Sequence, residues 1–79
     1  MISTIYPIGG MTVPADARAV KDALSAVPGI GAVATEIRPD GESVVILKHK
    51  EDVTLDPAVL DAAVRRAGDY TVGPGRPGR

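Results

Sequence analysis

Cysteine is absent from this chain of 79 residues, and so are tryptophan and phenylalanine. Without cysteine the protein has no thiol nucleophile, forms no disulfide and offers no thiolate to a metal ion. The single histidine, His49, stands outside any motif that would pair a nucleophile with a base. Gly9-Gly10 lacks the further glycines and the lysine of a phosphate-binding loop. We therefore expect a protein that is not an enzyme and that binds no cofactor.

The charge balance and the scarcity of aromatic residues exclude further classes of partner. Nine basic and ten acidic side chains give a net charge of -1, whereas binding to nucleic acid or to an anionic membrane needs a clear basic excess. Two tyrosines are too few for a base-stacking surface. The N-terminus has neither the basic lead of a signal peptide nor an apolar run long enough to cross a membrane. We expect a cytoplasmic protein without a nucleic-acid or membrane partner.

The length and the distribution of apolar residues indicate one small domain with a short tail. A chain of 79 residues, of which 44% are hydrophobic, can bury one modest core. Residues 73–79 consist of glycine, proline and arginine, with no side chain suited to packing. We expect an ordered domain over residues 1–72 and a disordered tail over residues 73–79.

The first half of the domain is predicted to contain a strand and a helix. Thr4, Tyr6 and Ile8 alternate with other residues, which is typical of a strand over residues 3–8. Pro14 suits the first position of a helix, and Pro28-Gly29 ends it. The apolar side of this helix is predicted to consist of Ala17, Val20, Leu24 and Val27.

The second half is predicted to contain a hairpin, a helix and a last strand. The turn residues Pro39-Asp40-Gly41 separate a strand over residues 30–37 from one over residues 43–48. Asp56 and Pro57 are typical of a helix start, and Gly68 of its end. Residues 70–72 can form a short final strand.

This order of elements predicts a ferredoxin-like α+β fold, with both helices on one face of a four-stranded antiparallel sheet. The opposite face of the sheet would then be open. The run Val44–Leu47 does not alternate, so it should place apolar side chains on both faces. We therefore expect an interaction surface at Val44, Val45, Ile46 and Leu47, for a protein partner or for self-association.

Three motifs carry a family resemblance over nearly all of the ordered region. They are Gly10-Met11-Thr12-Val13-Pro14-Ala15-Asp16, Val27-Pro28-Gly29-Ile30 and Ala67-Gly68-Asp69-Tyr70. Their order and spacing resemble the heavy-metal-associated domain family, which includes copper chaperones, mercury-binding proteins and modules of metal-transporting ATPases. The family pattern is Gly-Met-Thr-Cys-x-x-Cys, then Pro-Gly-Val, then Ala-Gly-Tyr; here Asp69 is inserted before the tyrosine.

The resemblance implies a function that this chain has lost. The family's two cysteines hold soft metals as thiolates, and Val13 and Asp16 stand at those positions. Valine has no lone pair, and aspartate is a hard oxygen ligand. We therefore expect a non-enzymatic binding module that acts through protein–protein interaction or self-association. The resemblance also implies that the motif loop and the first helix are a docking surface.

A metal carrier with nonstandard ligands is the alternative, and its candidate ligands are Met11, Asp16 and His49. Each has a structural explanation that we favour: Met11 packs in the core, Asp16 caps the first helix, and His49 is solvated in a charged loop. A third possibility is a small-molecule or anion site on the open sheet face, although no specific residue supports it. We expect no tight metal site.

Overall fold

The computed structural model describes residues 2–38 and 42–78. The predicted Pro39-Asp40-Gly41 turn lies outside these residues. The secondary-structure elements, in chain order, are β1 (Ile2–Gly9), α1 (Pro14–Ser25), β2 (Ile30–Glu36), β3 (Ser43–His49), α2 (Pro57–Ala67), β4 (Thr71–Val72) and β5 (Arg76–Pro77). Neither helix of the described part has the length and apolar character that a membrane crossing requires.

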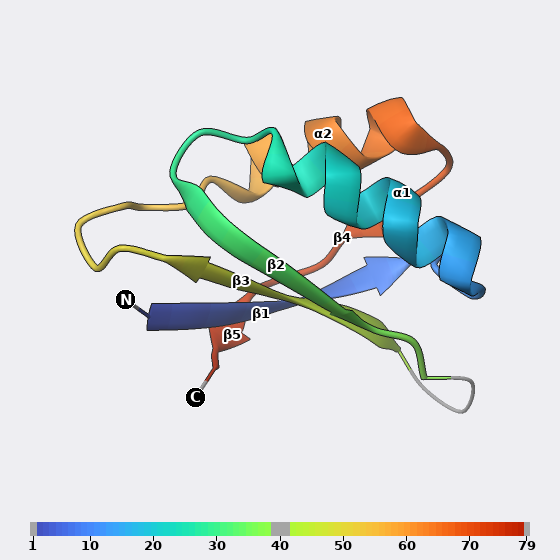
Figure 1. Cartoon of the computed structure of the whole chain (residues 1–79), viewed down its shortest axis with the longest axis horizontal. Helices are drawn as coiled ribbons and strands as arrows, with labels where there is room; N and C mark the ends of the chain where they lie inside the picture. Colours follow the sequence, from blue (N-terminus) through green and yellow to red (C-terminus); the bar gives the residue numbers. More distant parts are fainter. Residues whose placement is uncertain (1, 39–41, 79) are drawn as a thin grey trace.

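The strands form one antiparallel sheet in the order β2-β3-β1-β4, and both helices cover the same face of it (Figure 1). β1 pairs with β3 along almost its whole length, from Ile2 opposite His49 to Ile8 opposite Ser43. β4 pairs with the other edge of β1 at Ile8 and Gly9. The predicted ferredoxin-like α+β fold is therefore confirmed.

The core lies between the helices and the sheet, because each element has one apolar side that it can bury only against the others. Of the predicted apolar side of α1, Val20 and Leu24 are buried, and Ala17 and Val27 are partly buried against the core. Leu60 and Val64 are the buried residues of α2. The cluster of buried apolar residues consists of Tyr6, Ile8, Met11, Val20, Leu24, Val33, Val45, Leu47, Leu60, Val64 and Tyr70.

Both helices begin where proline and aspartate predict. Pro14 and Pro57 are the first residues of α1 and α2, where the missing N–H costs no hydrogen bond. The Asp56 side chain accepts a hydrogen bond of 2.9 Å from the backbone N–H of Ala58, which satisfies one free donor of the first turn.

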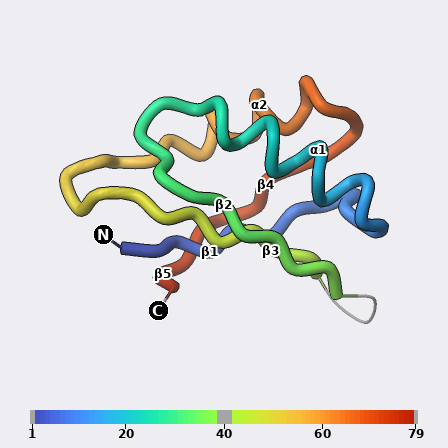
Figure 2. Tube along the Cα trace, in the orientation of Figure 1, coloured from blue at the N-terminus to red at the C-terminus, as the bar shows by residue number. Residues whose placement is uncertain are grey.

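The C-terminal tail departs from the disorder that we expected of residues 73–79. Arg76–Pro77 forms the additional strand β5, which pairs with Thr4 and Ile5 of β1 beyond the end of β4. Gly73 and Gly78 donate backbone hydrogen bonds to the carbonyls of Pro7 and Ser3, at 2.9 and 2.8 Å. Figure 2 shows the C-terminal segment passing along β1. Backbone pairing with an otherwise open strand edge holds this segment, which has few side chains to pack.

The apolar run on β3 also differs from its prediction. Val45 and Leu47 are fully buried in the core and so cannot form an exposed surface. Val44 points to the other face but is only 3% exposed. The residues that surround it in one pocket come from β1, the β2–β3 connection and the tail: Pro7, Arg38, Glu42, Pro74 and Arg76. Ile46 alone is half-buried, so the run Val44–Leu47 does not form the open apolar patch that we expected.

Replacing Gly75 with alanine should weaken the attachment of the tail. A Cβ atom at Gly75 would overlap the ring of Tyr6, which is 5% exposed and cannot easily move. Overpacking of this kind costs about 1–3 kcal/mol, so urea denaturation should show a loss of that size. The N–H of Gly78 should also exchange faster with solvent. Arg76→Ala, which keeps the backbone of β5, is the control; unchanged stability and exchange in Gly75→Ala would contradict the prediction.

Candidate functional site

The candidate site is the loop Gly10–Asp16, which joins β1 to α1. Gly10 has a φ angle of +90°, a conformation that favours glycine. A Cβ atom there would lie 2.6 Å from the carbonyl oxygen of Asp69, so the segment before β4 packs directly on the loop. The inserted residue Asp69 is therefore accommodated by the absence of a side chain at Gly10.

Asp16 holds the loop together through one oxygen of its carboxylate. Its Oδ2 atom accepts hydrogen bonds from the backbone N–H of Thr12 at 3.1 Å, the hydroxyl of Thr12 at 3.3 Å and the backbone N–H of Val13 at 3.3 Å. Val13 is the N-cap residue of α1 and has no side-chain oxygen that could accept a hydrogen bond from the free N–H groups of the first turn. Asp16, at the third helical position, reaches back instead, which confirms the capping role predicted for it.

The other oxygen of this carboxylate joins the loop to the C-terminal half of the chain. The hydroxyl of Tyr70 donates a hydrogen bond of 2.7 Å to Oδ1 of Asp16. This bond, followed by the one from the Thr12 N–H, lowers the pKa of Asp16 because both favour the ionised carboxylate. The same bond raises the pKa of Tyr70, since the phenolate would face an anion. All four hydrogen bonds hold Asp16 in its charged form.

The remaining side chains of the loop divide between the core and the surface. Met11 is 2% exposed and belongs to the buried cluster, as expected. Val13 is 50% exposed, the highest value among the three exposed large apolar residues of the described part, which are Ile2, Val13 and Val59. The loop therefore presents Val13 to solvent where the family pattern has its first cysteine.

His49 differs from its prediction as a solvated loop residue. It is the last residue of β3 and is 5% exposed, on the same side of the strand as Val45 and Leu47. Its Nδ1 donates to the carbonyl of Lys50 at 3.0 Å, and its Nε2 lies 2.9 Å from the hydroxyl of Thr4. The predicted strand ended at residue 48, whereas β3 ends at His49. Because His49 is part of the strand, its ring points to the same face as Val45 and Leu47, into the protein.

The three candidate metal ligands do not come together. His49 pairs with Ile2 at the start of β1, whereas Met11 and Asp16 follow its end. An eight-residue strand spans about 20–25 Å, and Figure 1 shows the two regions at opposite ends of the sheet. Within residues 2–38 and 42–78, no group of three histidine, aspartate or glutamate side chains could hold a metal ion together.

Sequence reasoning missed the contribution of Tyr70. The Ala67–Tyr70 motif marked the approach to the last strand, but nothing in it pointed to a hydrogen bond with Asp16. The two residues are 54 positions apart, and only the packing of the C-terminal segment on Gly10 brings them together.

No protein-family model and no curated protein sequence matches the chain. Solved structures do match over nearly its whole length. The yeast copper transporter domain Ccc2a, solved in apo and Cu(I)-loaded states, aligns with a TM-score of 0.68 and 14% identity, covering 100% of this chain and 97% of that one. The CopZ metallochaperone aligns with a TM-score of 0.66 and 17% identity, over 90% and 98%.

The N-terminal domain of ZntA in its Zn(II) form aligns with a TM-score of 0.68 and 19% identity, over 99% of this chain and 93% of that one. The chain has the fold of a heavy-metal-associated domain. Identities of 14–19% establish the fold alone. The heavy-metal-associated fold is thus present here with valine and aspartate in its loop, and the chemistry of that loop follows from its own residues.

Asp16→Asn should remove a pH-dependent part of the stability. Hydrogen bonds lower the pKa of Asp16 in the folded protein, so its charge stabilises the fold above the unfolded-state pKa. That contribution is lost as the pH falls through the folded pKa. Urea denaturation should therefore show the largest difference between wild type and Asp16→Asn near about pH 6, and a difference that shrinks towards about pH 2.

Tyr70→Phe tests the main cause of this shift. Removal of the hydroxyl should move the pKa of Asp16 up towards its usual value, as measured by NMR titration of the carboxyl carbon. Asp22→Asn is a control on the same helix, because Asp22 makes no side-chain hydrogen bond among the described residues. An unchanged titration of Asp16 in Tyr70→Phe would contradict the assignment.

Proposed function

We propose that this protein is a non-enzymatic protein-binding module that keeps the heavy-metal-associated fold without its soft-metal site. The observation that carries the proposal is the state of the two residues at the family's cysteine positions. The Asp16 carboxylate accepts four hydrogen bonds from within the protein, and Val13 is 50% exposed. The loop is thus a rigid support for an apolar side chain.

The chemistry of Asp16 argues against the alternative of a metal carrier. A metal ion on this carboxylate would have to compete with bonds that fix the loop and the start of α1. Carboxylate oxygen also has little affinity for the soft metals that thiolates bind. Met11 is buried and His49 lies at the far end of β1, so neither could complete a site with Asp16.

The hydrogen bonds of His49 support a role without catalysis. The only imidazole of the chain is 5% exposed, and both of its ring nitrogens have partners inside the protein, Thr4 and Lys50. A general base must reach a substrate proton, which this ring does not. The similar solved structures are a copper transporter domain, a metallochaperone and the N-terminal domain of ZntA in its Zn(II) form.

The proposed docking surface consists of the exposed residues at the loop tip and the start of α1, which are Thr12, Val13, Pro14 and Ala15. An apolar side chain on a backbone that is already ordered loses little entropy on binding. This makes Val13 the expected anchor of a small apolar contact. The run Val44–Leu47, by contrast, is mostly covered and contributes little to the proposed surface.

Restoring the cysteines should restore metal binding. We expect Val13→Cys combined with Asp16→Cys to bind one Cu(I) under reducing conditions, because thiolates at the start of a helix suit a soft metal. A competitive titration against a chelator measures the affinity, with the wild-type chain as control. A folded double variant that binds no Cu(I), or a wild type that binds it equally well, would contradict the proposal that the site was lost at these two positions.

Val13→Asp should abolish partner binding. Affinity capture followed by mass spectrometry should recover proteins with the wild type that are lost with this variant, since a charge at the anchor opposes apolar docking. Val59→Asp is a matched control, because Val59 is 47% exposed on α2, away from the loop. Equal recovery by Val13→Asp and Val59→Asp would place the binding surface elsewhere.

A further inference from the structure

We propose that the protein pairs with a second copy of itself through the outer edge of β2 and the side of α1 that lies over it. This pairing rests on the proposed function, because it names one partner of the binding module. Its groove shares only Pro14 with the proposed docking surface at the loop tip, and the substitutions that test the two surfaces lie at other residues, so the two can be tested separately.

β2 is an edge strand whose outer side has no neighbouring strand. Among the described residues it pairs only with β3, and the sheet ends there. Such an edge presents a row of unpaired N–H and C=O groups, to which another strand can add. The strand contains neither proline nor lysine, two residues that block an edge, and Val33 is its only buried residue. Its register irregularity lies at its start, between Ile30 and Ala32, so the part from Ala32 to Glu36 is regular.

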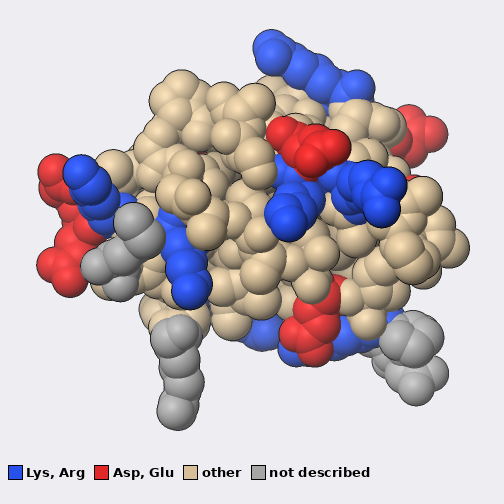
Figure 3. All heavy atoms as spheres, in the orientation of Figure 1, with Lys and Arg blue, Asp and Glu red and all other residues tan. Residues whose placement is uncertain are grey.

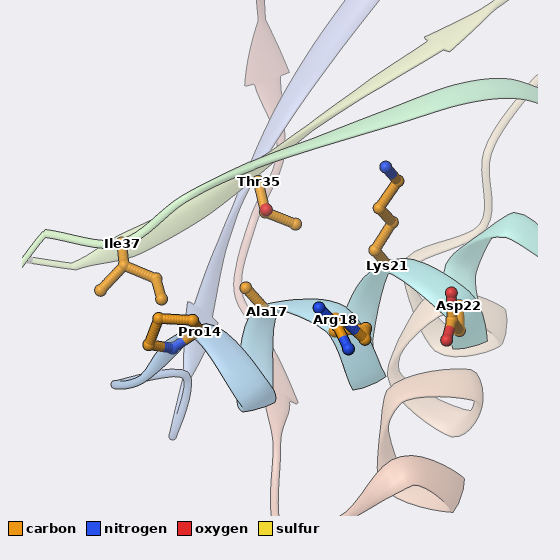
Figure 4. A pocket seen from close by; sticks show the side chains of 7 residues that line it. All are labelled: Pro14, Ala17, Arg18, Lys21, Asp22, Thr35 and Ile37. Atoms are coloured by element: carbon orange, nitrogen blue, oxygen red, sulfur yellow. The ribbon is translucent and has the colours of Figure 1, made fainter.

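A groove runs between this edge and α1. Its lining residues are Pro14, Ala17, Arg18, Lys21, Asp22, Thr35 and Ile37. Figure 4 shows that these side chains come from the exposed side of α1 and from the end of β2 with the residues after it. Pro14, Ala17 and Ile37 give the groove an apolar part, and charged residues stand along the helix.

The charges of the groove suit a copy of the same surface. Arg18 and Asp22 are four residues apart, so they lie one turn apart on the same side of α1. The ion pairs among the described residues involve neither of them. Two copies related by a two-fold axis would place Arg18 of each opposite Asp22 of the other, giving two intermolecular ion pairs.

The two-fold axis that this requires agrees with the course of the chain. Pro14 and Ile37 share one end of the groove, and the N–H of Ile30 bonds to the carbonyl of Val27 beyond the other end of α1. α1 therefore runs antiparallel to β2, and its midpoint lies over the middle of the strand. An axis between Arg18 and Asp22 then passes near the centre of β2, where two copies of the strand would pair antiparallel.

An acidic peptide is the competing occupant of the groove, and the charge distribution disfavours it. The face over α1 and β2 carries basic and acidic side chains side by side (Figure 3). A peptide of one charge sign would meet Asp22 as well as Arg18 and Lys21. A surface that carries both signs in a fixed order is instead complementary to its own antiparallel copy.

The test exchanges the two charges. Sedimentation equilibrium of the full chain at low ionic strength should show a concentration-dependent dimer. Arg18→Asp and Asp22→Arg should each raise the dimer dissociation constant at least about tenfold, because both cross pairs become repulsive. An equimolar mixture of the two variants should form a dimer that contains one copy of each. In this dimer the introduced aspartate of one variant faces the introduced arginine of the other, and the native Asp22 faces the native Arg18. Both residues are exposed on α1, so the fold should be retained in each variant.

Arg66→Asp on α2 is the matched control, with the same charge change away from β2, and should leave dimerisation unchanged. A monomeric wild type, or a mixture that fails to dimerise when each variant is folded, would overturn the pairing. Binding of a polyglutamate peptide that depends on Arg18 would overturn it in favour of an acidic partner. If the wild type stays monomeric but captures proteins in a way that depends on Val13, the proposed docking at the loop tip stands and the β2 pairing fails. If the wild type dimerises as expected but captures no protein through Val13, the β2 pairing stands and the docking at the loop tip fails.

Discussion

The hydrogen bond from the Tyr70 hydroxyl to the Asp16 carboxylate joins the loop before α1 to the segment before β4. The same carboxylate accepts hydrogen bonds from Thr12 and Val13, so one ionised side chain fixes the loop, caps the helix and bonds to the segment before β4. Hydrogen bonds to a charged acceptor are stronger than those between neutral groups. The glycine at position 10 completes the arrangement, because only a residue without Cβ lets the segment around Asp69 approach the loop.

This network gives the loop a chemistry different from that of the motif it resembles. Thiolates at these positions would leave electron pairs free for a soft metal, whereas Asp16 uses both of its oxygens within the protein. Binding by contact is the function that we propose instead, at exposed Val13 and along the open edge of β2. α1 contributes to both surfaces while its opposite side, through Val20 and Leu24, anchors it in the core.

Features that depend on near neighbours could be predicted from the sequence. Pro14, Asp56 and Pro57 mark helix starts because the requirements of a first turn are local, and the spacing of Val20 and Leu24 follows from the helical repeat. The order of elements then leaves few ways to bury two helices and a sheet, which is why the fold was predictable. The capping role of Asp16 was predictable for the same local reason.

Long-range pairing decided the rest. One further residue of β3 turns His49 into the protein, because side chains alternate between the faces of a strand. Residues 73–78 carry no side-chain signal for order, yet the open edge of β1 gives their backbone hydrogen-bond partners. Tyr70 meets Asp16 only when α2 and β4 have packed. The amino-acid pattern thus determined which elements form and which sides they bury, whereas tertiary contacts decided which polar groups meet, since those meetings depend on register across the whole sheet.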